Sequence, residues 1–194
     1  MILLVRHGRT IFNEEGRHQG GLDSPLTALG RSQAVRVGHR LAQLIEDPLS
    51  WAMVASPLGR TVHTAELIGA AMGFGGNFEL DPRLAELRMG DWEGLTGAEI
   101  DRGWPGQRGE AKTYDFLFRA PGGETYDALA ARLGDWLDQA LADPRPTLAI
   151  SHGMSIRVLR GLYLNLEPAA AIALDTPQDV VFRLDQGQVT RIEA

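Results

Sequence analysis

Residues 1–8 read MILLVRHG, and the fold is inferred from this junction between an apolar run and an Arg-His-Gly triplet. A short apolar run of this kind is typical of a buried strand, which here ends in a cation, an imidazole and a glycine. Open α/β sheets bind ligands beyond the carboxyl ends of their strands. We therefore expect Arg6 and His7 to lie at a ligand site.

Two further apolar runs end in the same way. Residues 147–151 (TLAIS) lead directly into His152 and Gly153, and residues 51–55 (WAMVA) are followed closely by Arg60. Right-handed crossovers bring the ends of parallel strands to one rim of a sheet. Because a basic residue lies at or just after the end of each of these three strands, we predict a single anion-binding pocket.

Between these strands, apolar residues recur at helical spacing, so predicted helices alternate with the strands along the chain. This order predicts an α/β fold built as a three-layer α/β/α sandwich around a mainly parallel sheet. A C-terminal β-hairpin follows, with a turn at residues 185–188. The predicted strands are 1–5, 51–55, 78–80 and 147–151, the predicted helices are 27–46, 57–72, 125–142 and 154–164, and the hairpin strands are 180–184 and 189–192.

In two regions the apolar residues do not recur at the regular spacing of a helix or a strand. Residues 8–26 predict a long loop at the end of the first strand, where long loops usually carry function. Residues 83–124 predict loops with one or two short helices. We interpret the chain as one domain, residues 1–194, with a lid-like insertion at about 87–124 that covers the pocket.

The composition narrows the class of ligand. A net charge of −6 argues against nucleic acid as a partner, although a few arginines in a cleft still attract a small anion. The opening apolar run is too short for a signal peptide, and no stretch is long enough to span a membrane. These features predict a cytoplasmic protein with no membrane partner, and leave its oligomeric state open.

His7 and His152 in one pocket are compatible with metal binding or with catalysis. The nearby arginines distinguish between these two possibilities. Arg6 and Arg60 would repel a divalent cation, whereas guanidinium groups match the geometry of a phosphate. A helix that begins just after Ser56 would add backbone N–H donors. We therefore predict a phosphate site with no metal and no other cofactor.

The chain has no cysteine, so His, Ser, Asp and water are the candidate nucleophiles, and His7 is the best placed. A neutral imidazole nitrogen can attack phosphorus if an acceptor, such as a carbonyl of the Gly8 loop, holds the other nitrogen. The leaving alcohol needs a proton. Glu86, set among apolar residues beyond the third strand, is the candidate donor.

In order along the chain, residues 6–10 (RHGRT), 56–61 (SPLGRT), Glu86 with 90–94 (GDWEG), and 151–153 (SHG) resemble the histidine phosphatase superfamily. That superfamily includes the cofactor-dependent phosphoglycerate mutases and many phosphatases, and the resemblance implies a phosphoglycerate mutase-like fold. It also implies that His7 becomes a phosphohistidine and that Glu86 first donates a proton and then activates water. The catalytic residues so implied are Arg6, His7, Arg60, Glu86 and His152.

The resemblance assigns contacts around these groups as well. Asn13 and the backbone of Gly153 would touch phosphate oxygens together with Arg6, His7, Arg60 and His152. Gln19 and Gly20 would contact the substrate. Arg9 stands where an acidic residue or glutamine is commoner, so we expect it to favour a more anionic substrate.

The predicted function is a metal-independent phosphatase that acts on a small phosphorylated metabolite. The alternatives are a cofactor-dependent phosphoglycerate mutase, for which residues 87–124 lack the expected basic cluster, and a non-catalytic phosphate- or phosphopeptide-binding module. We expect His18, His39 and His63 to lie outside catalysis. The aromatic residues Trp104, Tyr114, Phe116 and Phe118 either line the pocket or pack the lid.

Overall fold

The computed structural model describes residues 1–109 and 114–194, which form a six-stranded sheet of order β3-β2-β4-β1-β5-β6. β3, β2, β4 and β1 are parallel, while β5 and β6 add an antiparallel hairpin at one edge. The strands are β1 (Ile2–Arg6), β2 (Ala52–Ala55), β3 (Glu79–Leu80), β4 (Thr147–Ser151), β5 (Val180–Asp185) and β6 (Gln188–Glu193). The predicted mainly parallel sheet and C-terminal hairpin are confirmed.

The register of the parallel strands aligns their carboxyl ends. Arg6 of β1 lies opposite Ser151 of β4, and Ala55 of β2 lies opposite Ile150. The residues that follow these three strands therefore begin side by side at one edge of the sheet.

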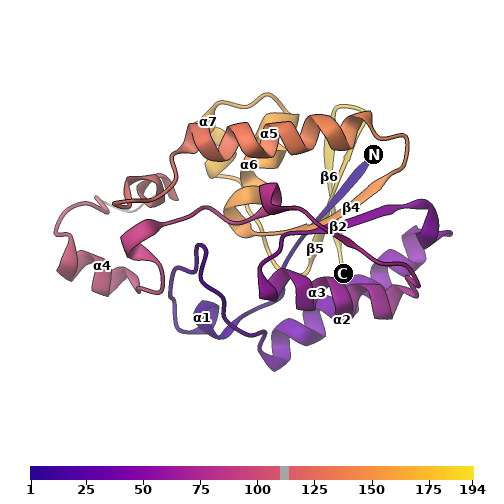
Figure 1. Cartoon of the computed structure of the whole chain (residues 1–194), viewed down its shortest axis with the longest axis horizontal. Coiled ribbons are helices and arrows are strands. Elements are labelled where there is room, and N and C mark those ends of the chain that lie inside the picture. The colour runs from indigo at the N-terminus through magenta and orange to yellow at the C-terminus, as the bar shows by residue number, and fades with distance from the viewer. Residues whose placement is uncertain (110–113) are drawn as a thin grey trace.

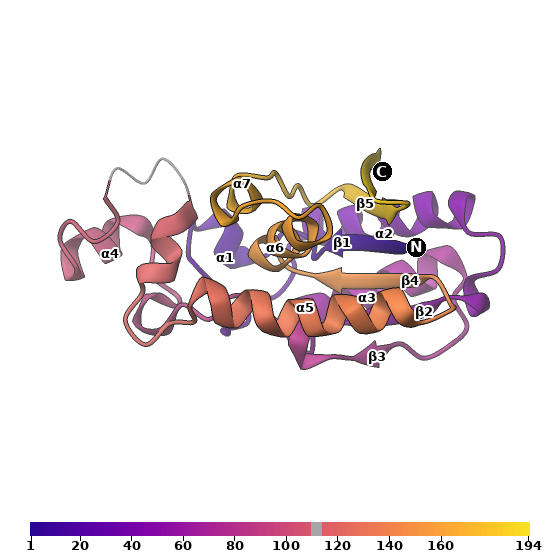
Figure 2. The same cartoon turned by 90° about the horizontal axis from the view of Figure 1, so that it is seen from above.

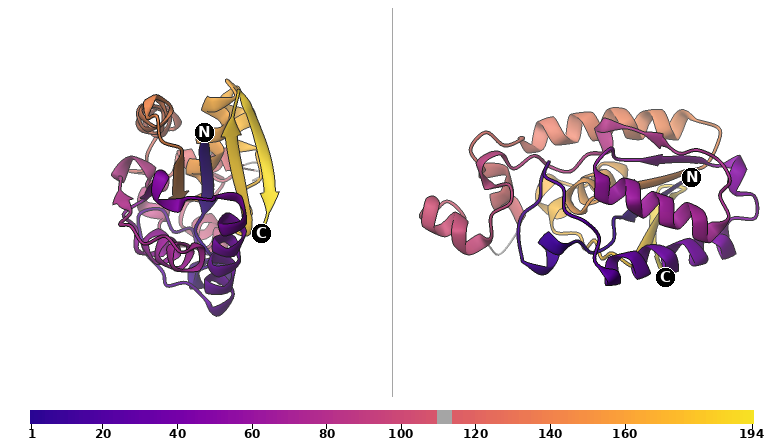
Figure 3. Two further views of the ribbon diagram at one scale, coloured as in Figure 1. Left: turned by 90° about the vertical axis from the view of Figure 1, so that its right-hand side faces the viewer. Right: turned by 60° about the horizontal axis from the view of Figure 1, so that its bottom comes forward.

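Helices cover both faces of the sheet and complete three layers (Figures 1 and 3). Leu3 and Val5 of β1 are buried against α2 (Ala28–Leu44) and α3 (Gly59–Met72). The alternate residues, Ile2 and Leu4, are buried in the core that contains α5 (Tyr126–Ala142) and α6 (Gly153–Tyr163). Successive strand side chains point to opposite faces, so one apolar run supplies both halves of the core.

One predicted helix begins later than expected. We expected Pro57 in its first turn, but α3 starts at Gly59 and Pro57 precedes it. The Asp23 carboxylate accepts hydrogen bonds from the backbone N–H groups of Gly59 and Arg60. These first amides are satisfied by a side chain from the long loop, and this fixes the start of the helix.

Short elements fill the regions without periodicity. The 8–26 loop contains one unpredicted turn of helix, α1 (Ile11–Glu14), and the predicted short helix of the 83–124 region is α4 (Gly97–Gly103). Figure 2 shows α4 beyond the end of the sheet, far from both termini. The other short elements are α7 (Pro168–Ile172), also unpredicted, and the 3-10 turns η1 (Pro48–Ser50), η2 (Pro82–Leu84), η3 (Gly90–Trp92) and η4 (Tyr114–Arg119).

Residues 110–113 of the predicted lid lie outside the described residues. Within the part that is described, Trp92, Phe116 and Leu117 are buried in the same core as α5 and α6. Across the described ranges, no helix combines the length and apolar character needed to cross a membrane.

Candidate active site

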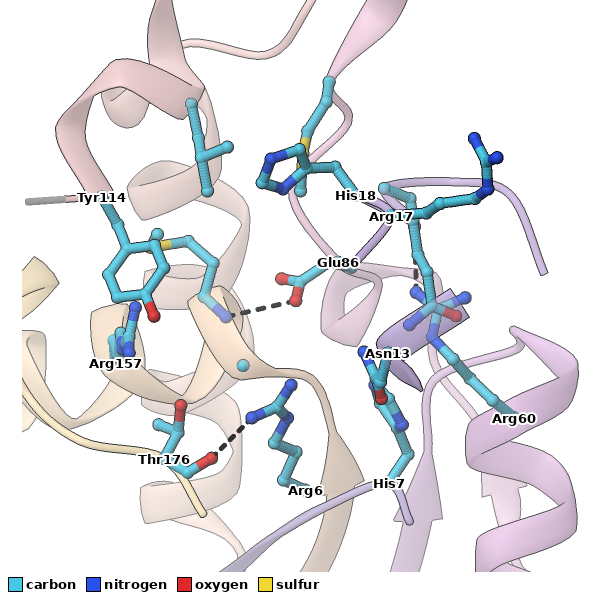
Figure 4. A pocket seen from close by; sticks show the side chains of 16 residues that line it. Arg6, His7, Asn13, Arg17, His18, Arg60, Glu86, Tyr114, Arg157 and Thr176 are labelled. Atoms are coloured by element: carbon cyan, nitrogen blue, oxygen red, sulfur yellow. Dashed lines mark hydrogen bonds between the residues drawn. The ribbon is translucent and has the colours of Figure 1, made fainter. Parts of the chain in front are cut away.

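A pocket lined by sixteen residues lies at the carboxyl edge of the sheet (Figure 4). It gathers the segments that follow β1, β2 and β4 together with the 8–26 loop and Glu86. The structure therefore brings together groups that are far apart in the sequence. The predicted site residues that line it are Arg6, His7, Asn13, Gln19, Gly20, Arg60, Glu86 and Gly153.

The His7 imidazole is held in one tautomer. Its Nδ1 lies 2.8 Å from the carbonyl oxygen of Gly8, which can only accept, so Nδ1 carries the proton and Nε2 keeps its lone pair. Burial lowers the pKa of His7 well below its usual value, and the nearby positive charges of Arg60 and Arg6 lower it further. The acceptor expected from the sequence, a carbonyl of the Gly8 loop, is the one that holds the ring.

Two glycines allow the loop after β1 to take this shape. A Cβ on Gly8 would lie 2.2 Å from the carbonyl oxygen of Gly30, and a Cβ on Gly30 would lie 2.1 Å from that of Arg9. Gly8 also donates its N–H to Thr64 Oγ1 of α3 at 3.1 Å. The start of α2 and the side of α3 thus fix the backbone that orients His7.

His152 lies behind His7 and has no exposed surface. The two rings meet edge-on, with centroids 5.3 Å apart. His152 Nε2 lies 2.8 Å from Ser56 Oγ, while its Nδ1 is buried without a partner in the described chain. Burial lowers the pKa of His152 well below its usual value, with Arg60 and His7 contributing. A neutral imidazole with an unsatisfied nitrogen is therefore available beside His7.

The two predicted arginines are anchored differently. Arg6 donates to the carbonyl oxygen of Thr176 at 2.8 Å. Arg60 is 2% exposed and donates to the carbonyl oxygens of Gly20 and Leu22, and its Nη1 lies 3.2 Å from Asp23 Oδ1. The Nε atoms of both arginines are buried without a partner among the residues described. Buried donors of this kind indicate a missing acceptor, such as a phosphate oxygen.

Glu86 is 9% exposed and accepts hydrogen bonds at the start of α6. Its carboxylate receives the backbone N–H groups of Met154 and Ser155 at 3.2 and 3.1 Å. A negative charge is stabilised at a helix N-terminus. The carboxylate is therefore fixed at the pocket wall that α6 supplies.

The backbone around Glu86 is fixed from two sides. Arg132 of α5 donates to the carbonyl oxygens of Arg83, Ala85 and Glu86 and pairs with Glu124 at 2.7 Å. From the other side, the hydroxyls of Ser151 and Ser155 donate to the carbonyl oxygens of Leu84 and Ala85. Sequence reasoning missed these hydrogen bonds, because their donors come from three separate elements, α5, β4 and α6.

Asn13 offers a donor to the pocket. Its Oδ1 accepts from the backbone N–H of Thr10 at 3.2 Å and from Gln178 Nε2 at 2.9 Å. The oxygen is thereby identified, and the Nδ2 group makes no hydrogen bond to the residues that the structure describes.

Two expectations about anion binding are wrong. Arg9 does not line the pocket: its Nε lies 3.6 Å from Glu14 Oε1, and its side chain is 41% exposed. The loop turns after Gly8 and carries Arg9 outward. The N-terminus of α3 is also not free for an anion, because Asp23 accepts its first N–H groups.

The structure adds residues to the predicted pocket lining, among them Tyr114, for which the sequence left open whether it lines the pocket or packs the lid. His18, which we expect to take no part in catalysis, lines the pocket, and burial lowers its pKa. Of the four aromatic residues in question, Tyr114 lines the pocket, whereas Trp104, Phe116 and Phe118 pack into the core. No strand end or motif marks these positions. The added residues are Arg17, His18, Met89, Tyr114, Leu117, Met154, Arg157 and Thr176.

Comparison with known proteins places this pocket in a family context. A family model described as the histidine phosphatase superfamily (branch 1) matches residues 2–191. A probable phosphoglycerate mutase GpmB from Erwinia tasmaniensis is 37% identical over 190 residues, which cover 96% of this chain and 85% of the relative. A glucosyl-3-phosphoglycerate phosphatase from Mycobacterium tuberculosis is 35% identical over 178 residues, which cover 87% and 77% of the two chains.

Solved structures agree with the sequence comparison. The mycobacterial glucosyl-3-phosphoglycerate phosphatase in complex with VO3 superposes with a TM-score of 0.77 at 32% identity, covering 94% of this chain and 92% of that one.

Proposed function

The chain belongs to the histidine phosphatase superfamily, and from this premise we propose that it hydrolyses a small phosphomonoester through a phosphohistidine at His7, without a metal ion. One observation carries the proposal. The Gly8 carbonyl holds Nδ1–H of a neutral His7, so the Nε2 lone pair is available in a pocket that also contains Arg6, Arg60 and Glu86. A nucleophile, a cationic anion site and a proton donor are the parts that phosphoryl transfer needs.

In the first step, His7 Nε2 attacks phosphorus, and the bond between phosphorus and the ester oxygen breaks. Glu86 in its protonated form gives its proton to the departing alcohol. Arg6 and Arg60 stabilise the charge on the phosphoryl oxygens. His152 Nδ1 and Asn13 Nδ2 have no hydrogen-bond partner among the described residues, and they provide two further donors when the His152 proton is on Nδ1.

That tautomer of His152 has support from its neighbour. Ser56 Oγ accepts the N–H of Leu58 at 3.4 Å, which leaves the serine proton for His152 Nε2. With Nε2 accepting, the ring proton is on Nδ1.

In the second step, the Glu86 carboxylate takes a proton from water, and the water oxygen attacks the phosphorus of the phosphohistidine. The N–P bond breaks, its electron pair returns to Nε2, and inorganic phosphate leaves. Glu86 is then protonated again, so one turnover restores the starting state.

The relatives carry names of both phosphatases and mutases, so the fate of the phosphoryl group needs its own argument. A mutase returns the group to its substrate and needs basic residues to hold phosphoglycerate. Among the described residues of the 87–124 segment, Met89, Tyr114 and Leu117 line the pocket, and Arg88 and Arg119 do not. This favours transfer to water. The predictions of a small phosphorylated metabolite as substrate and of a cytoplasmic location belong to the same proposal.

The test is release of inorganic phosphate from p-nitrophenyl phosphate in the presence of EDTA. We expect steady turnover that the chelator leaves intact. Absence of turnover would favour the non-catalytic binding module. Interconversion of 2- and 3-phosphoglycerate at a rate that rivals hydrolysis would favour the mutase.

A further inference from the structure

The outer wall of the pocket carries another cation, Arg157, which the proposed reaction does not use. It lies one helical turn after Gly153 on α6, so both residues face the same side of that helix. Both line the pocket. Figure 4 shows Arg157 next to Tyr114, and Arg6 between this pair and His7.

Arg157, like Arg6, has no ion-pair partner among the residues the structure describes, although both line the pocket. Its Nε is buried and makes no hydrogen bond within that part of the chain. By contrast, Arg60 pairs with Asp23, and Arg17 pairs with Glu15 and Glu99 at 2.9 Å. A buried guanidinium nitrogen without an acceptor indicates a ligand that supplies one.

Tyr114 holds the Arg157 side chain in place. The guanidinium carbon lies 4.0 Å from the centroid of the Tyr114 ring, within the range of a cation–π contact. Tyr114 belongs to η4 and Arg157 to α6, so the contact joins two walls of the pocket. Stacking restricts the guanidinium plane while leaving its N–H groups free to bind an anion.

The positive charges of the pocket arginines favour a ligand with more than one anionic group. A phosphomonoester held by Arg6 and Arg60 leaves Arg157 without a counter-charge. On the basis of the function proposed above, we propose that Arg157, stacked on Tyr114, binds a second anionic group of the substrate, a carboxylate or a second phosphate. The preference for an anionic substrate that the sequence suggested for Arg9 then belongs to Arg157.

The experiment compares matched substrates that differ in the second anion. For a carboxylate the pair is 3-phosphoglycerate and glycerol 3-phosphate; for a phosphate it is fructose 1,6-bisphosphate and fructose 6-phosphate. We expect wild-type kcat/KM to favour the more anionic member of at least one pair. In Arg157→Gln that preference should fall by about tenfold, as for the loss of one charge-assisted hydrogen bond. The pair that responds identifies the second anion.

Three further variants check the assignment. Tyr114→Ala should lower the same preference, because the ring no longer holds the guanidinium, and Tyr114→Phe should retain it. Arg119→Gln removes an arginine of η4 that pairs with Asp115 outside the pocket, and should leave the preference at the wild-type value. Equal losses for both members of each pair in Arg157→Gln would contradict the proposal.

A binding measurement separates this inference from the proposed reaction. Calorimetric titration of the same compounds into wild-type protein and Arg157→Gln needs no turnover. If wild-type protein fails to hydrolyse any phosphomonoester but still binds the more anionic compound more tightly through Arg157, only the reaction is refuted. If it turns over but binds both members of each pair equally, the role of Arg157 is refuted.

Discussion

The inner end of the pocket and its outer wall are built in different ways. At the inner end, Arg6 is the last residue of β1, and the buried His7 and His152 directly follow β1 and β4. The outer wall takes Arg17 and His18 from a loop, Tyr114 from η4 and Arg157 from α6. The inner end is thus rigid and suited to one chemical step, whereas the outer wall can vary without disturbing it. Substitutions at the two ends should therefore change different quantities.

The largest effect is expected at the nucleophile. His7→Gln removes the only ring nitrogen proposed to attack phosphorus and should lower kcat by about 10⁴-fold or more. The matched control is His39→Gln, which changes an exposed histidine of α2 and should keep wild-type kcat on p-nitrophenyl phosphate. Residual turnover in His7→Gln above a hundredth of wild type would show that the inner end does not act through His7.

Glu86→Gln keeps the size and hydrogen-bond acceptor of the side chain but removes its proton transfer. We expect kcat on glycerol 3-phosphate to fall by about 10²–10⁴-fold. With p-nitrophenyl phosphate, the rate of the first step, transfer of the phosphoryl group to His7, should fall less. The reason is that p-nitrophenolate leaves without needing a proton. Single-turnover release of p-nitrophenol measures that step. Equal losses in this step for the two substrates would exclude Glu86 as the proton donor.

The backbone packing behind His7 can be tested through stability. Gly30→Ala places a Cβ against the Arg9 carbonyl and should destabilise the fold by about 1–3 kcal/mol. Gly134→Ala in α5 is the control, because its Cβ would meet only Leu162 Cδ1 at 4.0 Å, and it should be neutral or stabilising by up to about 1 kcal/mol. Urea unfolding measures both. A Gly30→Ala protein as stable as Gly134→Ala would show that the inner end tolerates movement.

The smallest effect concerns pH. Because the pKa values of His7 and His152 are lowered in the folded protein, the unfolded chain takes up protons first as pH falls below about 6.5. Above that pH the two neutral histidines contribute fully to stability. As the pH falls from about 6.5 towards their pKa values in the folded protein, this contribution is lost. The free energy of unfolding should fall by up to about 1.4 kcal/mol per pH unit for each histidine. In His7→Gln the fall between pH 6.5 and 5.5 should be smaller, and an unchanged fall would contradict the assignment.

The same contrast explains what could be predicted from the sequence. Arg6, His7 and His152 follow apolar runs, and β-strand register carries that local signal directly into space. The acceptor for His7 was also predictable, because Gly8 is its neighbour in the chain. The outer wall has no such signal, since Tyr114 and Arg157 meet only after η4 and α6 have packed.

Some errors at the inner end have a similar cause. The N-terminus of α3 suggested an anion site, but Asp23, distant in sequence, satisfies its amides. Arg9 belongs to the RHGRT stretch of residues 6–10, yet the loop directs it to Glu14 instead of the pocket. The position of a side chain can be predicted from its neighbours in sequence along a strand, but not in the loop that follows the strand.

The central claim is that His7 carries the phosphoryl group, and trapping that intermediate tests it most directly. The protein would be mixed with p-nitrophenyl phosphate, quenched within milliseconds in alkaline denaturant, digested and analysed by mass spectrometry. The account predicts an acid-labile phosphoryl group on His7, which is absent from His7→Gln. A phosphoryl group on another residue, or turnover with none on the protein, would contradict it.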